Sequence, residues 1–194
     1  YYIVNTCLTK RIFDKFLLSD AKVFITLSSV KAVADTLKSE LTEEYLPMPI
    51  THYGKSKLLA EEYILSKTIP DGKRFYILRP CMIYGPKNKG NLNLLYKIVS
   101  KGFPWPLSSF ENKRSFCSID NLSFIISELI TNSKIKSGVY NIADTDSIST
   151  NELYNLICDS LNFKGVILNV PKIIINMIAN IATILKLPFN NNKL

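Results

Sequence analysis

Tyr53 and Lys57 are the residues whose types and spacing most directly indicate chemistry. They lie four positions apart in the segment HYGKSK (52–57), and this spacing places two side chains on one face of an α-helix. A nearby ammonium group favours the phenolate form of a tyrosine. A phenolate can take a proton from an alcohol while a hydride leaves the same carbon, so the pair is a candidate general acid/base.

A second pair with the same spacing, Tyr63 and Lys67, follows ten residues later. Ten residues of α-helix turn this pair by about 80° away from the first. The first pair follows two serines, Ser28 and Ser29, whereas the second has no upstream hydroxyl pair of its own. We therefore expect Tyr63 to pack against its neighbours and Lys67 to lie at a solvated helix end.

Apolar segments that read as strands alternate along the chain with segments of helical periodicity. Strands are predicted over residues 21–29, 74–78 and 138–142. Helices are predicted from a cap at Asn5 or Thr6 to about residue 16, over 52–67, near 93–101, from a cap at Asp120 or Asn121 to about 130, from a capping signal at 149–152, and over about 172–185.

This alternation predicts an α/β architecture with a parallel sheet. In such sheets, ligands and catalytic groups gather at the carboxyl ends of the strands. Ser28-Ser29 ends the first predicted strand and Arg79-Pro80 closes the second. The predicted site therefore lies where these two strands end.

Four segments resemble the extended short-chain dehydrogenase/reductase family, specifically its nucleotide-sugar epimerases and dehydratases. They are FITLSSVKAVAD (24–35), HYGKSKLLAEEYI (52–64), LRPCMIYGP (78–86) and NKRSFCSIDNL (112–122), and their order and spacing agree as well. The resemblance covers nearly the whole chain. It implies the C-terminal half of a Rossmann-type parallel sheet, formed by residues 1–86 with a returning segment at about 115–143. The rest of residues 87–194 would form a small α+β substrate-binding lobe.

The resemblance also implies roles for individual residues. Tyr53 would be the general acid/base, Lys57 would favour its phenolate form and hold the nicotinamide ribose, and Ser29 would hydrogen-bond the reacting sugar hydroxyl. The further cofactor contacts would come from Ser28, Pro80 and Met82. The substrate would also be bound by Tyr84, by Asn91 near the pyrophosphate, and by Arg114 as a clamp on the diphosphate.

Several of these residues, and some of their neighbours, have structural alternatives that the sequence leaves open. Ser28 and Ser29 could simply finish a strand. Arg79 could pair with a carboxylate and support the fold, Asn91 could cap a helix, and Arg114 could be a surface charge. His52 and Asp120 are expected to pack or to cap helices rather than to perform chemistry.

The glycine-rich turn with which family members bind the cofactor pyrophosphate does not occur in this sequence. None of the seven glycines precedes Tyr53, and the chain does not begin with Met. We therefore expect a fragment, truncated at both ends, of an enzyme that uses NAD or NADP. Removing the pyrophosphate site leaves the hydride carrier without a bound phosphate, so residues 1–194 alone are expected to have negligible turnover.

The expected function is that of an NAD(P)-dependent nucleotide-sugar epimerase or 4-keto-sugar reductase. Dehydratases of the family usually carry an Asp-Glu pair after the strand-end hydroxyl, whereas Val30-Lys31 occupies those positions here. The alternative is a non-catalytic relative that binds a nucleotide sugar or a protein. By resemblance, helices at about 5–18 and 52–67 would form a homodimer interface.

Composition narrows the remaining classes of function. The net charge of +8 comes from 24 basic residues, of which only four are arginines, and they are dispersed along the chain. Dispersed lysines indicate a solvated surface rather than a nucleic-acid groove. The four cysteines form no metal-binding or disulfide pattern, so we expect reduced thiols, no metal site and a cytoplasmic location. The most apolar stretch, 173–187, is too short and too polar to span a membrane comfortably.

Overall fold

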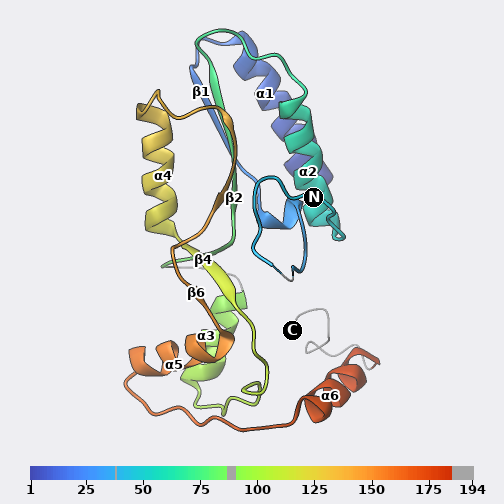
Figure 1. Ribbon diagram of the computed structural model, residues 1–194, viewed down its shortest axis with the longest axis vertical. Coiled ribbons are helices and arrows are strands. Elements are labelled where there is room, and N and C mark those ends of the chain that lie inside the picture. The colour runs from blue at the N-terminus through green and yellow to red at the C-terminus, as the bar shows by residue number, and fades with distance from the viewer. Residues whose placement is uncertain (38, 87–90, 185–194) are drawn as a thin grey trace. The chain divides into compact units, whose positions relative to one another are not determined.

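The computed structural model describes residues 1–37, 39–86 and 91–184 of the chain. It divides into two compact units (Figure 1). The first unit comprises residues 1–85 and 115–145, and the second comprises residues 86–114 and 146–194. The chain therefore leaves the first unit after Gly85, returns at Ser115 and leaves it again after Thr145.

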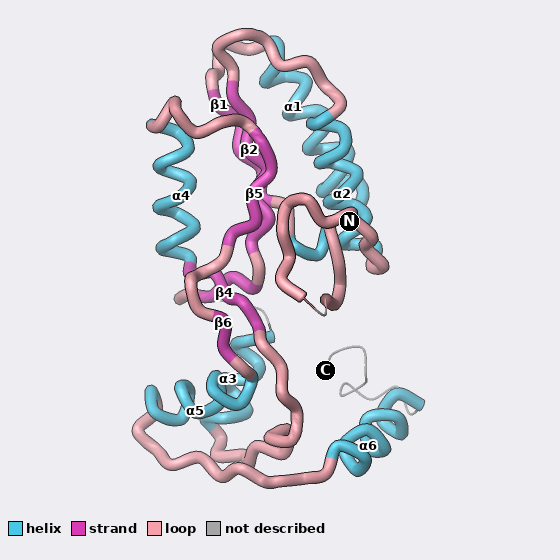
Figure 2. Tube along the Cα trace, viewed as in Figure 1, coloured by secondary structure: helices cyan, strands magenta, loops and turns pink. Residues whose placement is uncertain are grey.

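A three-stranded parallel sheet forms the centre of the first unit. Its strands are β1 (Val23–Leu27), β2 (Arg74–Pro80) and β5 (Gly138–Ile142), in the order β1-β2-β5. The register pairs Leu27 with Leu78 and Leu78 with Tyr140, so β1 and β2 end close together. The predicted α/β class with a parallel sheet is thereby confirmed, and Figure 2 shows the three strands side by side.

Helices cover both faces of this sheet because β2 is apolar on both sides. Successive side chains of a strand point to opposite faces, and the two faces of β2 belong to two separate cores. Figure 1 shows α1 (Thr9–Leu18) and α2 (His52–Leu65) on one face and α4 (Ile119–Thr131) on the other. The first core contains Phe13, Phe16, Ile64 and Ile77. The second contains Tyr76, Leu78, Cys117, Leu122, Leu129 and Ile142.

The first helical segment begins earlier than the sequence predicts. A π-helical turn, η1 (Tyr2–Leu8), leads directly into α1, so neither Asn5 nor Thr6 is a helix cap. Their side chains instead bind α2: Thr6 Oγ1 donates to the carbonyl of Ser56 at 2.7 Å, and Asn5 Nδ2 donates to Ser56 Oγ at 3.0 Å. The cap prediction was wrong because these polar groups join two helices.

Two short strands, β3 (Met82–Tyr84) and β4 (Arg114–Ser118), lie between β2 and β5 in the chain and pair in parallel with each other. The helix α4 begins directly after β4, and its N-cap is Ser118, whose hydroxyl accepts from the backbone N–H of Asn121. The sequence prediction placed the cap at Asp120 or Asn121 and was wrong by two or three residues. Asp120 lies in the first turn, where a negative charge favours the helix N-terminus.

The second unit contains α3 (Asn91–Ser100), β6 (Ser147–Ile148), α5 (Thr150–Ser160) and α6 (Lys172–Ile184). Its core is formed by Val99, Trp105, Tyr154, Ile157 and Cys158. The helix α5 begins with the predicted capping box, in which Ser149 and Glu152 each bind the other's backbone N–H. The predicted start of this helix is therefore confirmed.

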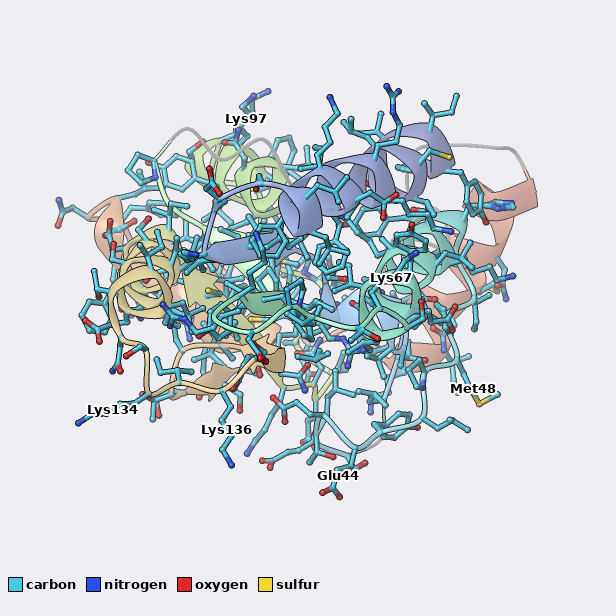
Figure 3. The ribbon with its side chains drawn as sticks, turned by 90° about the horizontal axis from the view of Figure 1, so that it is seen from above. Glu44, Met48, Lys67, Lys97, Lys134 and Lys136 are labelled. Carbon is cyan, nitrogen blue, oxygen red and sulfur yellow. The ribbon has the colours of Figure 1, made fainter. Side chains whose placement is uncertain are left out.

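The lysine side chains, the four thiols and the helices can each be compared with what the composition predicts. The side chains of Lys134 and Lys136 extend outward from the first unit (Figure 3). Cys117 and Cys158 are buried, Cys81 is partly buried and Cys7 is exposed, and none of the four forms a disulfide. Burial raises the pKa of the Cys81 thiol to about 12. Among the helices of the described ranges, none is long and apolar enough to cross a membrane.

Candidate active site

The start of α2 is fixed by two sets of polar contacts. Thr51 is the N-cap, and its hydroxyl accepts from the backbone N–H of Gly54 at 3.2 Å. Asp35 accepts from the backbone N–H groups of Ile50 and Thr51 at 2.9 and 3.2 Å, and its carboxylate also pairs with Lys31 at 3.3 Å. These contacts place Tyr53 in the first turn of the helix.

Gly54 brings this first turn against the segment that follows Ser29. A Cβ on Gly54 would overlap the carbonyl oxygen of Lys31 and lie 2.9 Å from the Cβ of Pro49. Only a glycine therefore lets α2 approach the short 3-10 helix η2 (Val30–Ala32) this closely. The close approach is one reason why Tyr53 and Ser29 belong to neighbouring parts of the structure.

Ser29 is partly buried and is the N-cap of η2. Its Oγ accepts from the backbone N–H of Lys31 at 3.2 Å. A hydroxyl that accepts in this way keeps a proton with which it can donate to a substrate oxygen. The position after β1 is therefore suited to orienting an alcohol, as the sequence predicts for Ser29.

Lys57 lies one turn after Tyr53, as the spacing predicts. Its ammonium group lies 6.0 Å from the centre of the Tyr53 ring and donates to the carbonyl of Leu27 at 2.8 Å. Burial lowers the pKa of Lys57, and the charge of Glu61 opposes this shift. The ammonium group has three donors, so two remain to bind other groups beside Tyr53.

Ser28 and Arg79 both bind the carboxylate of Glu61, which was not predicted as a site residue. Glu61 accepts from the hydroxyl of Ser28 and from Arg79 Nε and Nη2, the last two at 3.0 and 2.5 Å. Of the alternatives for Arg79, the structure shows the pairing with a carboxylate. The proton of the Ser28 hydroxyl is engaged within the protein, and a cofactor contact by Ser28 stays a prediction.

The other predicted cofactor and substrate residues lie at the end of β2 or after it in the chain. Pro80 is buried at the end of β2 and Met82 is partly buried in β3. Tyr84 is 38% exposed, and its hydroxyl is hydrogen-bonded to Asp144, which raises the pKa of Tyr84. Asp144 also accepts from the backbone N–H of Ser118 at 3.1 Å, so it links Tyr84 to the start of α4.

Two predicted substrate residues belong to the second unit. Asn91 is the first residue of α3, and its side chain lies outside the described residues. Arg114 is exposed at the start of β4 and takes part in an interaction within the structure. The structure brings Tyr53 and Lys57 together and joins Lys57 to Leu27, two residues before Ser29. The roles of all five of these predicted residues stay predictions.

Tyr63 packs against its neighbours as predicted, whereas His52 does not cap α2, because the N-cap is Thr51. Tyr63 donates to both oxygens of Asp14, at 2.7 and 2.9 Å, and the ammonium group of Lys67 lies 4.4 Å from its ring centre. The second Tyr/Lys pair therefore connects α2 to α1. His52 is exposed and its Nδ1 lies 3.2 Å from the hydroxyl of Tyr2.

Of the three carboxylates that support the site, Glu61 is the one that a signal in the sequence could have revealed. Glu61 follows Lys57 by four residues, as Lys57 follows Tyr53, and this spacing places successive side chains on one side of a helix. A glutamate that is buried on a helix needs charged or hydrogen-bonding partners. Asp35 and Asp144 carry no such signal, because the backbone N–H groups of Ile50, Thr51 and Ser118 that they bind lie in other segments of the chain.

Comparison with known proteins agrees with this geometry. A sequence model of the NAD dependent epimerase/dehydratase family matches residues 1–143. UDP-glucose 4-epimerase of Vibrio cholerae is 33% identical over 156 residues, which are 79% of this chain and 48% of the relative. N-acetyl-alpha-D-glucosaminyl-diphospho-ditrans,octacis-undecaprenol 4-epimerase of Escherichia coli O157:H7 is 31% identical over 166 residues, 84% of this chain and 50% of the relative.

The fold is shared with solved structures at lower identity. The structure of MoeE5 in complex with UDP-glucose and NAD has a TM-score of 0.71 at 19% identity, over 88% of this chain and 59% of that protein. Similar solved structures include complexes with NAD and with NADP. The chain spans about half the length of the two epimerases that it matches in sequence.

Proposed function

The chain belongs to the NAD dependent epimerase/dehydratase family, and on this premise we propose that the protein is an NAD(P)-dependent nucleotide-sugar 4-epimerase. The observation that carries the proposal is the placement of Tyr53 and Lys57 on one face of α2, with Lys57 bound to the end of β1 immediately before Ser28-Ser29. The relatives that are 33% and 31% identical are both named as 4-epimerases, one of UDP-glucose and one of a lipid-linked diphosphate sugar.

In this proposal, the phenol oxygen of Tyr53 exchanges a proton with the sugar. The ammonium group of Lys57, 6.0 Å from the ring centre, stabilises the phenolate that results when Tyr53 gives up its proton. Ser29 donates a hydrogen bond to the sugar oxygen and fixes the alcohol for proton transfer. Each of these groups lies at or beside the carboxyl end of β1, the usual place for ligands in a parallel sheet.

The donor set beside Tyr53 fits a dinucleotide cofactor. Lys57 has one donor on the carbonyl of Leu27 and two others with which to bind ribose hydroxyls. Tyr53 and Lys57 would hold the nicotinamide ribose, and Pro80 at the end of β2 and Met82 in β3 would make further cofactor contacts. The bound cofactor would supply the reversible acceptance of hydride from the sugar carbon.

The sequence after Ser29 favours epimerisation or reduction over dehydration. The positions where dehydratases carry acidic residues hold Val30 and Lys31. Lys31 is also engaged, since its ammonium group contacts both the backbone and the carboxylate of Asp35, at 2.8 and 3.3 Å. The segment therefore offers no acid for removing water from the sugar, and a 4-keto-sugar reductase is the second candidate.

The decisive experiment follows the hydroxyl configuration of a nucleotide sugar. The full gene product that carries these residues is incubated with UDP-glucose or UDP-N-acetylglucosamine and NAD, and the epimers are separated by chromatography. Tyr53→Phe should lower kcat by about a thousandfold, in line with the loss of a general acid/base. Tyr63→Phe, which removes a hydroxyl from the second Tyr/Lys pair of the same helix, should leave kcat close to that of the wild type.

The products formed in this experiment distinguish the 4-epimerase from the reductase and from the non-catalytic alternative. Interconversion of epimers supports the proposal, whereas consumption of NADPH with a 4-keto sugar and no epimer formation would favour the reductase. Binding of the nucleotide sugar without either reaction would favour the non-catalytic alternative. Equal kcat for Tyr53→Phe and the wild type would refute the role of Tyr53.

We also propose that the protein forms a homodimer through η1, α1 and α2. These segments expose a set of large apolar side chains: Ile3, Val4, Leu8, Ile12 and Leu59. Exposed apolar clusters of this kind mark interaction surfaces. Light scattering after size-exclusion chromatography should give twice the monomer mass for the wild type and a monomer for Ile12→Glu. The equally exposed Leu156, changed to Glu as a control, should leave the mass unchanged.

A further inference from the structure

Glu61 is a buried carboxylate to which the proposed chemistry gives no role. Its side chain lies on α2 four residues after Lys57, and the residue is 1% exposed. Removing an ionised carboxylate from water is costly unless charged and hydrogen-bonding partners replace the water. The partners of Glu61 therefore show what this position contributes to the site.

All of the side-chain partners come from the ends of two adjacent strands. The hydroxyl of Ser28, directly after β1, donates to Oε1. Arg79, near the end of β2 and 4% exposed, donates from Nε at 3.0 Å and from Nη2 at 2.5 Å to Oε2. A guanidinium bound to a carboxylate through two nitrogens constrains direction as well as distance.

These two strand ends are also bound to each other and to Lys57. The backbone N–H of Ser28 donates to the carbonyl of Leu78 at 2.7 Å, which continues the pairing of β1 with β2. Lys57 donates to the carbonyl of Leu27 at 2.8 Å. Two successive turns of α2, at Lys57 and at Glu61, are thus bound to consecutive residues of the chain just before Ser29.

We propose that Glu61, paired with Arg79, is a positioning residue that fixes the rotation and height of α2 so that Tyr53 and Lys57 face the hydroxyl of Ser29. This role rests on the proposed function, because it assigns no chemistry to Glu61 itself. An apolar contact at this point would permit the helix to slide or turn slightly. A displacement of about 1 Å is enough to cost a catalytic site about a hundredfold in rate.

A conservative variant and a matched control test the role in the full protein. Glu61→Gln keeps the size of the side chain and removes its charge, so it weakens the contact with Arg79. The neighbouring Glu62 is exposed on the same helix, so Glu62→Gln makes the same chemical change outside the network. We expect Glu61→Gln to lower kcat by about tenfold to a hundredfold with KM within about threefold of the wild type, and Glu62→Gln to change neither.

A double variant separates positioning from stability. Glu61→Gln alone leaves the guanidinium of Arg79 buried without its counter-charge, which destabilises a fold strongly. Glu61→Gln/Arg79→Met removes both charges, and buried ion pairs replaced in this way often leave stability unchanged or improved. A double variant that unfolds at the wild-type temperature but retains the low kcat supports the proposal. A double variant with wild-type kcat overturns it.

A second readout does not depend on turnover. Burial lowers the pKa of Lys57 and the charge of Glu61 raises it, so removing that charge lets Lys57 lose its proton at a lower pH. Acetylation of Lys57 by acetic anhydride, measured by mass spectrometry against the exposed Lys55 of the same peptide, should therefore begin at a lower pH in Glu61→Gln. The alkaline limit of kcat should move in the same direction, which a purely structural loss of kcat would not produce.

The two readouts distinguish failure of this inference from failure of the proposed function. If the wild type converts no nucleotide sugar, the proposed function fails, and the acetylation profile alone still reports whether Glu61 controls the surroundings of Lys57. An unchanged ratio of Lys57 to Lys55 acetylation across the pH range, in a folded Glu61→Gln variant, would contradict the inference even in an active enzyme.

Discussion

Lys73 and Arg74 are neighbours in the chain, and their side chains close the carboxyl ends of two different helices. Lys73 donates to the carbonyls of Phe16, Ser19 and Ala21, where α1 ends. Arg74 donates to the carbonyls of Leu129, Ile130 and Asn132, where α4 ends. Because β2 begins at Arg74, the start of the central strand holds one helix on each face of the sheet.

We predict that Lys73→Met and Arg74→Met each lower the free energy of unfolding by about 1–2 kcal/mol. The last carbonyls of a helix lack backbone partners and carry partial negative charge, which a bound cation stabilises. Urea unfolding followed by circular dichroism measures the change. Lys134→Met, at a side chain that points away from the protein (Figure 3), should differ from the wild type by less than about 0.5 kcal/mol.

Gly54→Ala should lower both stability and activity. The added methyl group would overlap the carbonyl oxygen of Lys31, and relieving such overpacking costs about 1–3 kcal/mol. The first turn of α2, with Tyr53, would have to move away from η2, so kcat should fall together with the melting temperature.

Gly138→Ala is the matched control for this prediction. A Cβ there would meet only Tyr140, at 3.8 Å, which is ordinary contact. If Gly54→Ala were as stable and active as Gly138→Ala, the close approach of α2 to η2 would not be required for the site.

Asp35→Asn should destabilise the protein by about 1–2 kcal/mol at pH 7, the usual value of charge-assisted hydrogen bonds. Burial alone would raise the pKa of Asp35, but the N–H groups of Ile50 and Thr51 and the charge of Lys31 outweigh it and lower the pKa below 3.8. A carboxylate whose pKa is lowered on folding stabilises the native state above its unfolded pKa and loses this effect as the pH falls through its folded pKa.

The difference between the wild type and Asp35→Asn should therefore be constant above about pH 5 and shrink progressively below about pH 4. Unfolding in urea at pH 7, 5 and 3 measures it. A difference that persisted undiminished at pH 3 would show that the charge of Asp35 is not the source of the stabilisation.

Much of the first unit follows from the sequence, because its signals are local. Apolar runs predicted all three strands of the central sheet, and the four-residue spacing of Tyr53 and Lys57 predicted their common face. The helix start at Ser149 was predicted for the same reason, since a capping box involves residues three apart.

What could not be predicted depends on partners that are distant in the sequence. Asn5 and Thr6 have the types of cap residues, yet their side chains bind Ser56 about fifty residues away. The network of Glu61 joins three segments, and only the folded sheet brings Ser28 and Arg79 to the same carboxylate. Helix-capping propensity describes how a side chain binds the backbone of its own helical turn. The side chains of these residues instead bind other helices and strands.

Trp105 is the single tryptophan of the sequence, and it should report on the second unit alone. Its ring stacks on Tyr154 with 5.3 Å between ring centres, and its indole N–H donates to Asn151 Oδ1 at 2.7 Å. We predict that Asn151→Ala shifts the tryptophan emission and lowers the stability of this unit by about 1–3 kcal/mol, because a buried donor loses its acceptor.

Asn155→Ala is the control, since Asn155 is exposed on the same helix, α5. Its emission spectrum and unfolding midpoint should match those of the wild type. Matching spectra for Asn151→Ala as well would contradict the hydrogen bond between Asn151 and the indole.

The distribution of the four thiols makes the protein suitable for selective labelling. The thiolate form of cysteine, and not the thiol, reacts with maleimides. Because the pKa of Cys81 is raised to about 12, almost none of its thiol is ionised near neutral pH. Cys117 and Cys158 are buried, so Cys7 on η1 is the thiol that a reagent can reach. A fluorophore could therefore be attached at one defined position without mutagenesis. Because η1 belongs to the proposed dimer surface, energy transfer between labelled copies would follow assembly in real time.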